Sequence, residues 1–306
     1  MRLSIVIPVY NTGGYLAACI NSCLAQDIPS YEYEIILIND GSTDDSQEII
    51  EEYCRGYPNV RAGSQRNCGL SVARNTGLDM ATGDYVWFVD SDDTIRKNCL
   101  DSLLDYAEGS DILAFGPVLH RHRMTGPEYI IATKGHFQHG APFYIFRRQF
   151  LIRNELRFYP GIYHEDSEFT PRALYYAEYL VVCTDNCYSR TVRPGSITRM
   201  ADIRRAYDLI FVAGRLKDFI ARNFMDYRLR KVMLGLPPLL VNSSLNVASQ
   251  TDPNYWVAYG KRFIFFRTVS YFLQSGDPRY VAEGVLLSLS RNPVRTYIRI
   301  SRCFRH

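Results

Sequence analysis

Three aspartates follow an apolar run in the segment YVWFVDSDDTI, residues 85–95. Asp90, Asp92 and Asp93 stand within four positions, directly after the apolar residues 86–89. Like charges a few ångströms apart repel by roughly 1 kcal/mol in water and by several times as much near a protein surface. Carboxylate oxygens are ligands that Mg²⁺ and Mn²⁺ prefer. The cluster therefore predicts a bound divalent cation, which would offset the repulsion.

A second pair of acids, Glu165 and Asp166, stands in the segment HEDSEF, residues 164–169. A carboxylate held beside a hydroxyl group can take up its proton during a displacement, so this pair is a candidate general-base site. Acidic residues also gather in the first turn of helices, where they interact favourably with the helix dipole. The sequence leaves both interpretations open, and it favours a solvated loop position for His164.

Apolar runs and helical patterns alternate through the first hundred residues. A continuous apolar run predicts a buried strand, and apolar residues at spacings of three and four predict a helix. The expected strands cover residues 3–10, 33–40, 60–65 and 84–90, and the expected helices cover 14–26, 42–57 and 69–83. Ser42 is the expected N-cap of the second helix, and Asp93 that of a further helix beginning near Ile95. The alternation predicts an α/β fold with a mainly parallel sheet and helices on both faces.

Unusual polar residues follow the end of each of these four strands. In sheets of this kind, ligands bind outside the carboxyl ends of the strands. The residues concerned are Tyr10 and Asn11, then Asn39, Asp40 and Gly41, then Asn67 and Gly69, and finally the cluster from Asp90 to Asp93. The sequence therefore predicts that the functional site lies at this rim of the sheet.

The pattern changes beyond residue 96. Further strands are expected within 111–119, 142–148 and 179–190, a helix within 161–177, and a loop or small hairpin within 120–141. From residue 201 onward the pattern is helical, with interruptions at Pro237, Pro238 and Pro253. Residues 1–200 carry a net charge of −7 and residues 201–306 one of +10. We expect two regions with different surroundings, a mixed one up to residue 200 and a helical, basic one over 201–306.

Composition excludes several classes of protein. With 306 residues, 47% hydrophobic and 22% charged, the chain is expected to be globular rather than disordered. No window of about 18 consecutive apolar residues is present, so no membrane-spanning helix is expected, and the N-terminal segment reads as a first strand rather than a secretory signal. The eight cysteines form no C-x-x-C pair, which favours buried free thiols in a reducing cytoplasm over a zinc site.

Four motifs occur in a characteristic order: SIVIPVYN, INDGSTDDS, GLSVARNTGLDMATGDYVWFVDSDD and HEDSEF. Together they resemble the inverting glycosyltransferases of family 2, of the type found in bacterial polysaccharide biosynthesis. The resemblance covers residues 3 to about 200. It implies a GT-A fold, Rossmann-like and mainly parallel, with a nucleotide-binding half over 1–96, an acceptor half over 97–200 and the helical region 201–306 as an extension.

The resemblance also implies an activity. We expect a hexosyltransferase that uses a nucleotide-sugar, Mn²⁺ or Mg²⁺, and the hydroxyl group of a glycan or a lipid-linked acceptor. Such an enzyme works in the cytoplasm or on the inner face of the cytoplasmic membrane. No nucleic acid is an expected partner.

Particular residues receive roles by the same resemblance. Asp90-Ser91-Asp92 matches the D-x-D motif, in which Asp92 binds the metal and Asp90 faces the ribose or the metal shell. Asp166 matches the general base and Glu165 its supporting neighbour. The predicted donor-binding residues are Pro8, Tyr10 and Asn11 around the base, Asn39 and Asp40 at the base edge, Arg74 and Asn75 near base or diphosphate, and Arg193 and Arg199 in a loop that grips the diphosphate.

Asp40 bears on the choice of nucleotide. Its carboxylate can accept a hydrogen bond from N3–H of uracil, which favours uridine or thymidine over adenine and guanine. The family often has aspartate where this chain has Asn39. An Asx turn leading into Ser42 accounts for the same residues, and both interpretations can hold together.

The last 16 residues, 291–306, hold five arginines and no acid. The arginines stand three and four residues apart, and Tyr297, Ile298, Ile300 and Phe304 are interleaved with them. A basic helix with an apolar stripe is typical of a membrane-surface element. A solvated helix packed on the rest of the protein explains the pattern as well.

Other functions fit parts of the sequence. VWFVDSDDT matches the nucleophile strand of haloacid dehalogenase-like phosphatases, but three strand–helix units precede it here. A nucleotidyltransferase needs a basic glycine-rich loop after the first strand, and PVYNTGGY contains no basic residue. A non-catalytic binder of nucleotide-sugars does not need both Asp92 and Asp166. We therefore expect a metal-dependent glycosyltransferase.

Overall fold

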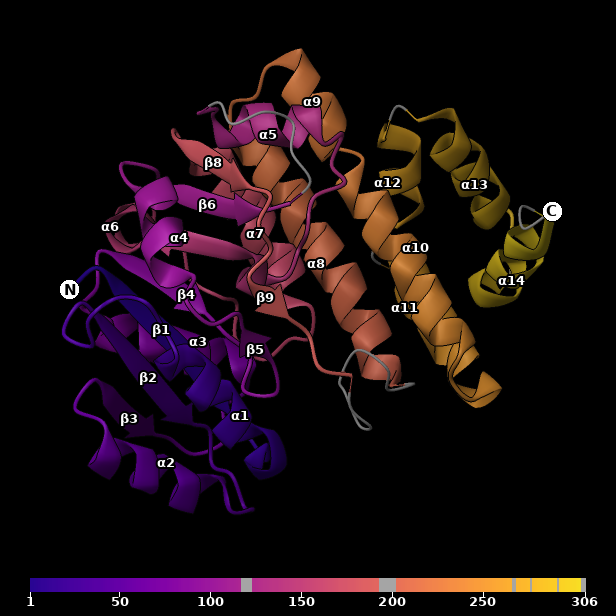
Figure 1. The fold of residues 1–306 in the computed structure, drawn as a ribbon. Coiled ribbons are helices and arrows are strands. Elements are labelled where there is room, and N and C mark those ends of the chain that lie inside the picture. The colour runs from indigo at the N-terminus through magenta and orange to yellow at the C-terminus, as the bar shows by residue number, and fades with distance from the viewer. Residues whose placement is uncertain (117–122, 193–201, 266–267, 276, 291, 304–306) are drawn as a thin grey trace. The chain divides into compact units, whose positions relative to one another are not determined.

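The computed structural model describes residues 1–116, 123–192, 202–265, 268–275, 277–290 and 292–303 (Figure 1). The chain forms two compact units. The first, called the sheet unit here, contains residues 1–129, 137–161 and 169–192. The second, called the helical unit, contains 130–136, 162–168 and 193–306. Each unit therefore includes more than one stretch of the chain.

A seven-stranded sheet forms the centre of the sheet unit, in the order β3-β2-β1-β4-β7-β6-β8 (Figure 1). The strands are β1 (Leu3–Val9), β2 (Tyr33–Asn39), β3 (Val60–Ser64), β4 (Tyr85–Phe88), β6 (Ile112–Phe115), β7 (Tyr144–Arg147) and β8 (Leu180–Cys183). Only β7 runs antiparallel to its neighbours, β4 and β6. The predicted mainly parallel sheet is confirmed, and the carboxyl ends of β1, β2 and β4 meet at one rim.

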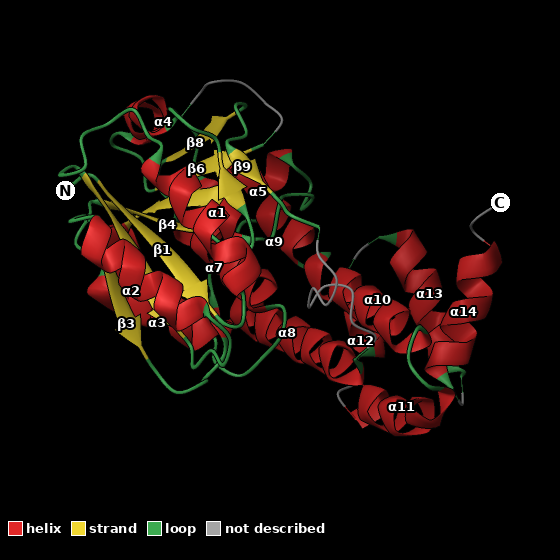
Figure 2. Ribbon diagram, turned by 60° about the horizontal axis from the view of Figure 1, so that its bottom comes forward, coloured by secondary structure: helices red, strands yellow, loops and turns green. Residues whose placement is uncertain are grey.

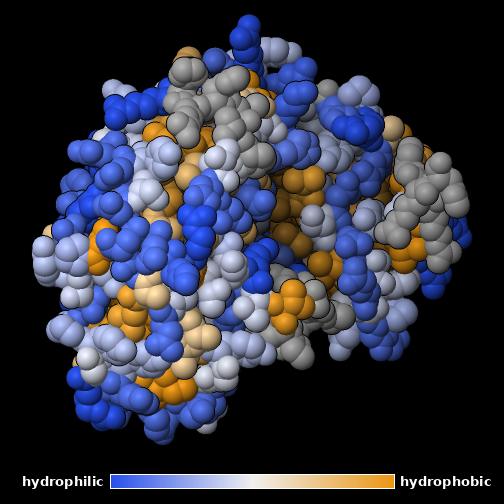
Figure 3. All heavy atoms as spheres, in the orientation of Figure 1, coloured by the Kyte–Doolittle hydropathy of each residue, from blue (hydrophilic) through white to orange (hydrophobic). Residues whose placement is uncertain are grey.

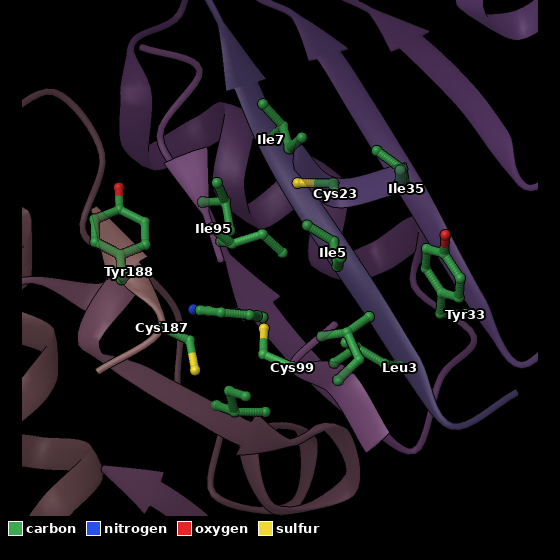
Figure 4. Packing of buried hydrophobic residues seen from close by; sticks show 14 of the residues in the cluster. Leu3, Ile5, Ile7, Cys23, Tyr33, Ile35, Ile95, Cys99, Cys187 and Tyr188 are labelled. Atoms are coloured by element: carbon green, nitrogen blue, oxygen red, sulfur yellow. The ribbon is translucent and has the colours of Figure 1, made fainter. Parts of the chain in front are cut away.

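Helices cover both faces of this sheet. They are α1 (Gly13–Leu24), α2 (Ser46–Gly56), α3 (Leu70–Met80), α4 (Leu100–Ala107) and α6 (Arg148–Arg153). On one face, Leu3, Ile5 and Ile7 pack in a cluster that includes Cys23 of α1 (Figure 4). On the opposite face, α3 approaches so closely that a Cβ at Gly77 would stand 2.2 Å from Val6 Cγ1. Alternate residues of β1 thus supply both cores, as in a strand buried on both sides.

Three sequence-based expectations for the middle of the chain were wrong. No helix begins near Ile95; residues 94–95 form the short strand β5, which pairs with β9 (Tyr188–Ser189). The strand expected over 179–190 is two strands, β8 and β9, in different sheets. In the described part of 120–141, a helix, α5 (Gly126–Ala132), stands where a loop or small hairpin was expected, and a 3₁₀ turn follows at Ala141–Phe143.

The start of α2 also differs from expectation. The helix begins at Ser46, so Ser42 is not its N-cap. Instead, the Ser42 hydroxyl accepts a hydrogen bond from the Asn11 amide, and the Ser42 amide donates to Asn39 Oδ1. Gly41, with φ of +73°, turns the chain away from helical geometry at this point. The polar residues 39–45 therefore form a structured loop at the rim.

The helical unit contains the predicted C-terminal helices (Figure 2). They are α8 (Ile203–Arg222), α9 (Tyr227–Met233), α10 (Leu236–Ser249), α11 (Trp256–Phe265), α12 (Val269–Gln274), α13 (Pro278–Ser288) and α14 (Pro293–Cys303), with a 3₁₀ turn at Pro253–Tyr255. Asp202, Asp226 and Asp277 cap three of them by accepting backbone N–H bonds. Pro237 and Pro238 stand in the first turn of α10, where proline is tolerated.

One stretch, Tyr227–Ser249, is long and apolar enough to pass a composition test for a membrane span. Of its most apolar window, 56% is buried inside the structure, as in the core helix of a globular protein. This is weak evidence for a span.

The seven described cysteines are free, and five of them are buried.

Candidate active site

The end of β1 is tied to the loop before α2. Tyr10 is 48% exposed at the rim, and Asn11 adopts a left-handed conformation with φ of +50°. Asn11 Oδ1 accepts from the Thr43 amide at 2.8 Å and from its hydroxyl at 3.3 Å. Pro8 is buried inside β1. The rim thus presents the Tyr10 ring, while Asn11 fixes the adjoining loop.

Asp40 organises the start of α3. The residue is only 3% exposed. Oδ1 accepts from Gln65 Nε2 at 2.7 Å and from the Cys68 amide at 2.8 Å, and Oδ2 accepts from the Gly69 amide at 2.8 Å. Three of its roughly four acceptor sites are therefore used inside the protein. Its predecessor Asn39 is equally engaged, because its amide group donates to Gln47 Oε1 and accepts from a backbone N–H.

Asp90 is paired with a buried arginine. Arg74 Nη2 lies 2.7 Å from Asp90 Oδ1, and the Arg74 side chain is only 1% exposed. The Arg74 guanidinium also lies 5.1 Å from the centre of the Phe158 ring. A buried guanidinium needs a charged or polarisable neighbour, and here it has both. Arg74 therefore offsets part of the negative charge in the aspartate cluster.

Asn75, the next residue of α3, contacts backbone atoms. Its Nδ2 donates to the Phe158 carbonyl at 2.9 Å, and its Oδ1 accepts from the Phe158 amide at 3.0 Å. The Phe158 ring stacks on Phe169 with centroids 4.0 Å apart. Asn75 thus fixes the backbone of Phe158, whose ring contacts the Arg74 guanidinium. Its predicted place beside the nucleotide stays a prediction.

Asp93 does not cap a helix, because no helix begins there. Its buried Oδ1 accepts from the Thr191 amide at 2.7 Å, and its Oδ2 accepts from the Tyr188 hydroxyl. The same hydroxyl accepts from the Asp90 amide at 3.3 Å. Burial raises the pKa of Asp93, and the charges of Asp90 and Asp92 raise it further, against the hydrogen bonds from Tyr188 and Thr191. Sequence reasoning missed Tyr188, which gave no signal beyond its place in an expected strand.

Ser91 connects the aspartate cluster to the end of β1. It is buried, and its hydroxyl accepts from Thr12 Oγ1 at 2.9 Å. Asp92, by contrast, is half-buried. Asp90 and Asp92 are thus both partly exposed, Asp90 in an ion pair with Arg74, whereas Asp93 is buried and hydrogen-bonded.

Glu165 and Asp166 lie in the helical unit. They stand in the first turn of α7 (Glu165–Tyr176), which confirms the expected helix start. Glu165 is buried and Asp166 half-buried, and His164 before them has a φ of +63°. The left-handed conformation of His164 turns the chain into the helix.

Residues 4–164 match the family model described as glycosyl transferase family 2. The chain belongs to that family. It is 30% identical over 254 residues to the uncharacterized glycosyltransferase YibD of Escherichia coli K12, covering 74% of this chain and 72% of YibD. It is also 30% identical over 201 residues to the poly(ribitol-phosphate) beta-N-acetylglucosaminyltransferase TarS of Staphylococcus aureus, covering 61% of this chain but 35% of TarS.

The fold of this family 2 enzyme is also found in a solved structure. The crystal structure of S. aureus TarS residues 1–349 in complex with UDP-GlcNAc has a TM-score of 0.74, at 22% identity. The match covers 100% of this chain and 92% of that one. The protein is thus a glycosyltransferase with the GT-A fold, as predicted from the motifs.

Some predicted residues of this glycosyltransferase lie outside the described residues. Arg193 and Arg199 are two of them. In the C-terminal stretch, the described part of α14 has exposed side chains at Arg295 and Arg299, half-buried ones at Tyr297, Ile298 and Ile300, and a fully buried one at Val294. The apolar residues of α14 therefore pack within the helical unit.

The donor atoms at the rim fit a hard divalent cation that shares its shell with a substrate. Within the described ranges, no group of three or more His, Cys, Asp or Glu side chains is arranged to hold a metal. Asp90 and Asp92 supply two carboxylates at the rim. Mg²⁺ is commonly held by one or two carboxylates together with substrate phosphates and waters, rather than by a closed protein cage. The residues present fit that arrangement.

Proposed function

We propose that this glycosyltransferase transfers a sugar from a UDP-sugar, with inversion, to a hydroxyl group of a surface glycan or its lipid-linked precursor. One observation carries the proposal. The ends of β1, β2 and β4 bring an exposed aromatic ring, the Asp40 carboxylate and the half-exposed Asp92 to one rim. These are the groups that a nucleoside, a pyrimidine edge and a metal-bound diphosphate require.

At the donor side, Tyr10 would stack on the base and Asp40 would accept from N3–H of uracil with its remaining acceptor site. Pro8, Asn11 and Asn39 shape this part of the rim. Asp92 and Asp90 would hold Mn²⁺ or Mg²⁺, which neutralises the diphosphate leaving group when bound. Arg74 keeps one Asp90 oxygen in place at 2.7 Å. Asn75, Ser91, Arg193 and Arg199 complete the proposed donor site.

At the acceptor side, Asp166 would act as the general base. Inversion at the anomeric carbon needs one in-line displacement, so a single base that takes the proton of the acceptor hydroxyl is sufficient. Glu165, buried next to it, would orient Asp166 or the acceptor. TarS is a poly(ribitol-phosphate) beta-N-acetylglucosaminyltransferase whose crystal structure holds UDP-GlcNAc, and the similarity to it supports a polymeric acceptor and a UDP-sugar donor.

We further propose that the enzyme works in the cytoplasm, at the inner membrane surface, where a lipid-linked acceptor would be found. The region 291–306 supplies the positive charge for such contact. Arg295 and Arg299 are exposed on α14, as a helix facing anionic headgroups requires.

Calorimetric titration of UDP, GDP and dTDP tests the donor assignment. We expect UDP to bind in the presence of Mn²⁺, and Asp92→Asn to weaken that binding at least tenfold by removing one anionic ligand. The control is Asp101→Asn, which removes an exposed acid elsewhere in the sheet unit. Manganese-dependent UDP affinity that is unchanged in Asp92→Asn would remove this residue from the metal shell. Absence of nucleotide binding under every condition would reject the proposal.

A further inference from the structure

The segment 162–168, which carries Glu165 and Asp166, belongs to the helical unit although the sheet unit flanks it on both sides in sequence. The described contacts of this segment explain why. Those made with the long helix α8 form two anchors, one on each side of Asp166.

The first anchor lies before the acids. The Tyr163 amide donates to Asp208 Oδ2 at 2.9 Å. The guanidinium of Arg204 lies 5.2 Å from the centre of the Tyr163 ring, within range of a cation–π interaction. Both the backbone and the ring of Tyr163 are thus held by residues one helical turn apart on α8.

The second anchor lies after the acids. Glu168 is 1% exposed, and Arg215 approaches its Oε1 with both Nε and Nη2 at 2.9 Å. A carboxylate buried to this degree is strongly dependent on its charged partner. Arg204, Asp208 and Arg215 are separated by four and seven residues, so they occupy one face of α8.

We propose that α8 positions the general base, with Asp208 and Arg215 as positioning residues for Asp166. Asp166 stands three residues after one anchor and two residues before the other. Between them, His164 holds a left-handed backbone conformation, which a non-glycine residue keeps only where its surroundings fix it. A base must stand within hydrogen-bond reach of the proton it takes, so loss of an anchor would misplace it.

This inference rests on the proposed function, since it explains why α8 would hold Asp166, the proposed general base, in place. It extends that function to a region outside the matched family model, which ends at residue 164. The helical unit then supplies the support of one catalytic group, in addition to any contact with a membrane.

The test uses the full chain with Asp208→Ala, Arg215→Met and Arg215→Lys. The first readout is hydrogen exchange of backbone amides, which needs no substrate. We expect faster exchange over 163–168 in Asp208→Ala and Arg215→Met, with unchanged exchange in β4. Arg215→Lys keeps a charge beside Glu168 and should restore most of the protection. Unchanged exchange over 163–168 in both variants would overturn the proposal.

The second readout separates turnover from donor binding. With UDP-GlcNAc as donor and poly(ribitol phosphate) as acceptor, we expect kcat to fall about 10- to 100-fold in Asp208→Ala and Arg215→Met. UDP affinity with Mn²⁺ should stay within twofold, and Arg215→Lys should recover turnover. If variants with faster hydrogen exchange over 163–168 keep the wild-type kcat, the positioning role is wrong.

The matched control is Arg153→Met. Arg153 pairs with the buried Asp111 in the sheet unit at 3.5 Å, again a partly exposed arginine on a buried acid. This variant should lower thermal stability to a similar degree and leave kcat unchanged. A wild-type chain that binds no UDP would reject the proposed function, whereas the exchange measurement still decides whether α8 anchors the segment.

Discussion

At the scale of single residues, the three aspartates of one sequence motif have different structural partners. Asp90 is fixed by Arg74, Asp93 by Tyr188 and Thr191, and Asp92 keeps a half-exposed side chain. The repulsion expected from the sequence is thus already reduced inside the protein. Asp90 and Asp92 both keep partly exposed carboxylates at the rim, the set that a metal-bound diphosphate would complete in the proposed function.

Asp166→Asn tests the chemical step directly. The amide cannot take up a proton, so we expect transfer to fall by about 10²- to 10⁴-fold. UDP affinity in the presence of Mn²⁺ should not change, because Asp166 is not a proposed donor-binding residue. Product formation from UDP-GlcNAc and calorimetric titration measure the two quantities.

The reference for this comparison is Glu165→Gln, which alters the supporting neighbour and should reduce transfer less. Transfer by Asp166→Asn at near wild-type rate would mean that another residue is the base. Loss of UDP binding in the same variant would place Asp166 in the donor site instead.

At the scale of the elements, apolar periodicity predicted the strands and helices whose pattern lies in their own residues. The strands β1 and β2 and the helices α1 and α3 follow from their apolar patterns, within a few residues at each end. The pairing of β5 with β9 was missed, because each has two residues and its partner lies about ninety positions away. The start of α2 was missed because Asn39 and Gly41 bind the chain into a loop where Ser42 alone suggests a cap.

The same limit applies to the site. The rim position of Tyr10, Asp40 and Asp90 could be predicted, since strand ends in a parallel sheet converge. The hydrogen bond from Tyr188 to Asp93 and the contacts of residues 162–168 with α8 could not be predicted. These contacts join residues that lie 95 and about 45 positions apart, and no local pattern records them.

The packing of α3 on the sheet gives an element-scale prediction. Gly77→Ala places a Cβ 2.2 Å from Val6 Cγ1, and valine is too stiff at χ1 to move aside easily. Overpacking costs about 1–3 kcal/mol, against a gain of up to about 1 kcal/mol in helix propensity. We expect the free energy of unfolding to fall by about 1–2 kcal/mol, as measured by denaturant titration.

Gly14→Ala in α1 is the matched control, since a Cβ there meets no atom within 4 Å. This change should leave stability unchanged or raise it by up to about 1 kcal/mol. Equal effects of the two substitutions would contradict the close approach of α3 to β1.

At the scale of the whole molecule, the two units divide the proposed chemistry. The sheet unit carries the described residues of the proposed donor site, and the helical unit carries Asp166 together with the helices that follow it. The boundary expected near residue 200 falls outside the described residues and stays a prediction. The helical unit also includes the segments 130–136 and 162–168, so it is not formed by the C-terminal part of the chain alone.

The surface of the helical unit refines the membrane hypothesis. The apolar residues of α14 are partly or fully buried, whereas α13 exposes Val285 and Leu286, and its C-cap residue Leu289 is 80% exposed. Their spacings of one, three and four residues put these three on one side of the end of α13. Figure 3 shows, on one face of the molecule, apolar patches among hydrophilic side chains. Two acids stand shortly before these residues in sequence. Asp277 forms an ion pair with Arg279, and Glu283 accepts a hydrogen bond from Asn242. Apolar contact would thus come from α13 and positive charge from α14.

Sedimentation with vesicles tests this division of roles. On vesicles that contain phosphatidylserine, we expect Arg295→Gln with Arg299→Gln to weaken binding by about thirtyfold, at roughly 1 kcal/mol for each charge. Leu286→Ser with Leu289→Ser should weaken binding to a similar degree but with little dependence on salt, because the lost contribution is apolar burial. Val257→Ser, an exposed apolar residue of α11, is the control and should bind as wild type. If the wild-type chain does not sediment with anionic vesicles at low salt, the helical unit does not bind the membrane by itself, and its remaining proposed role is to hold residues 162–168.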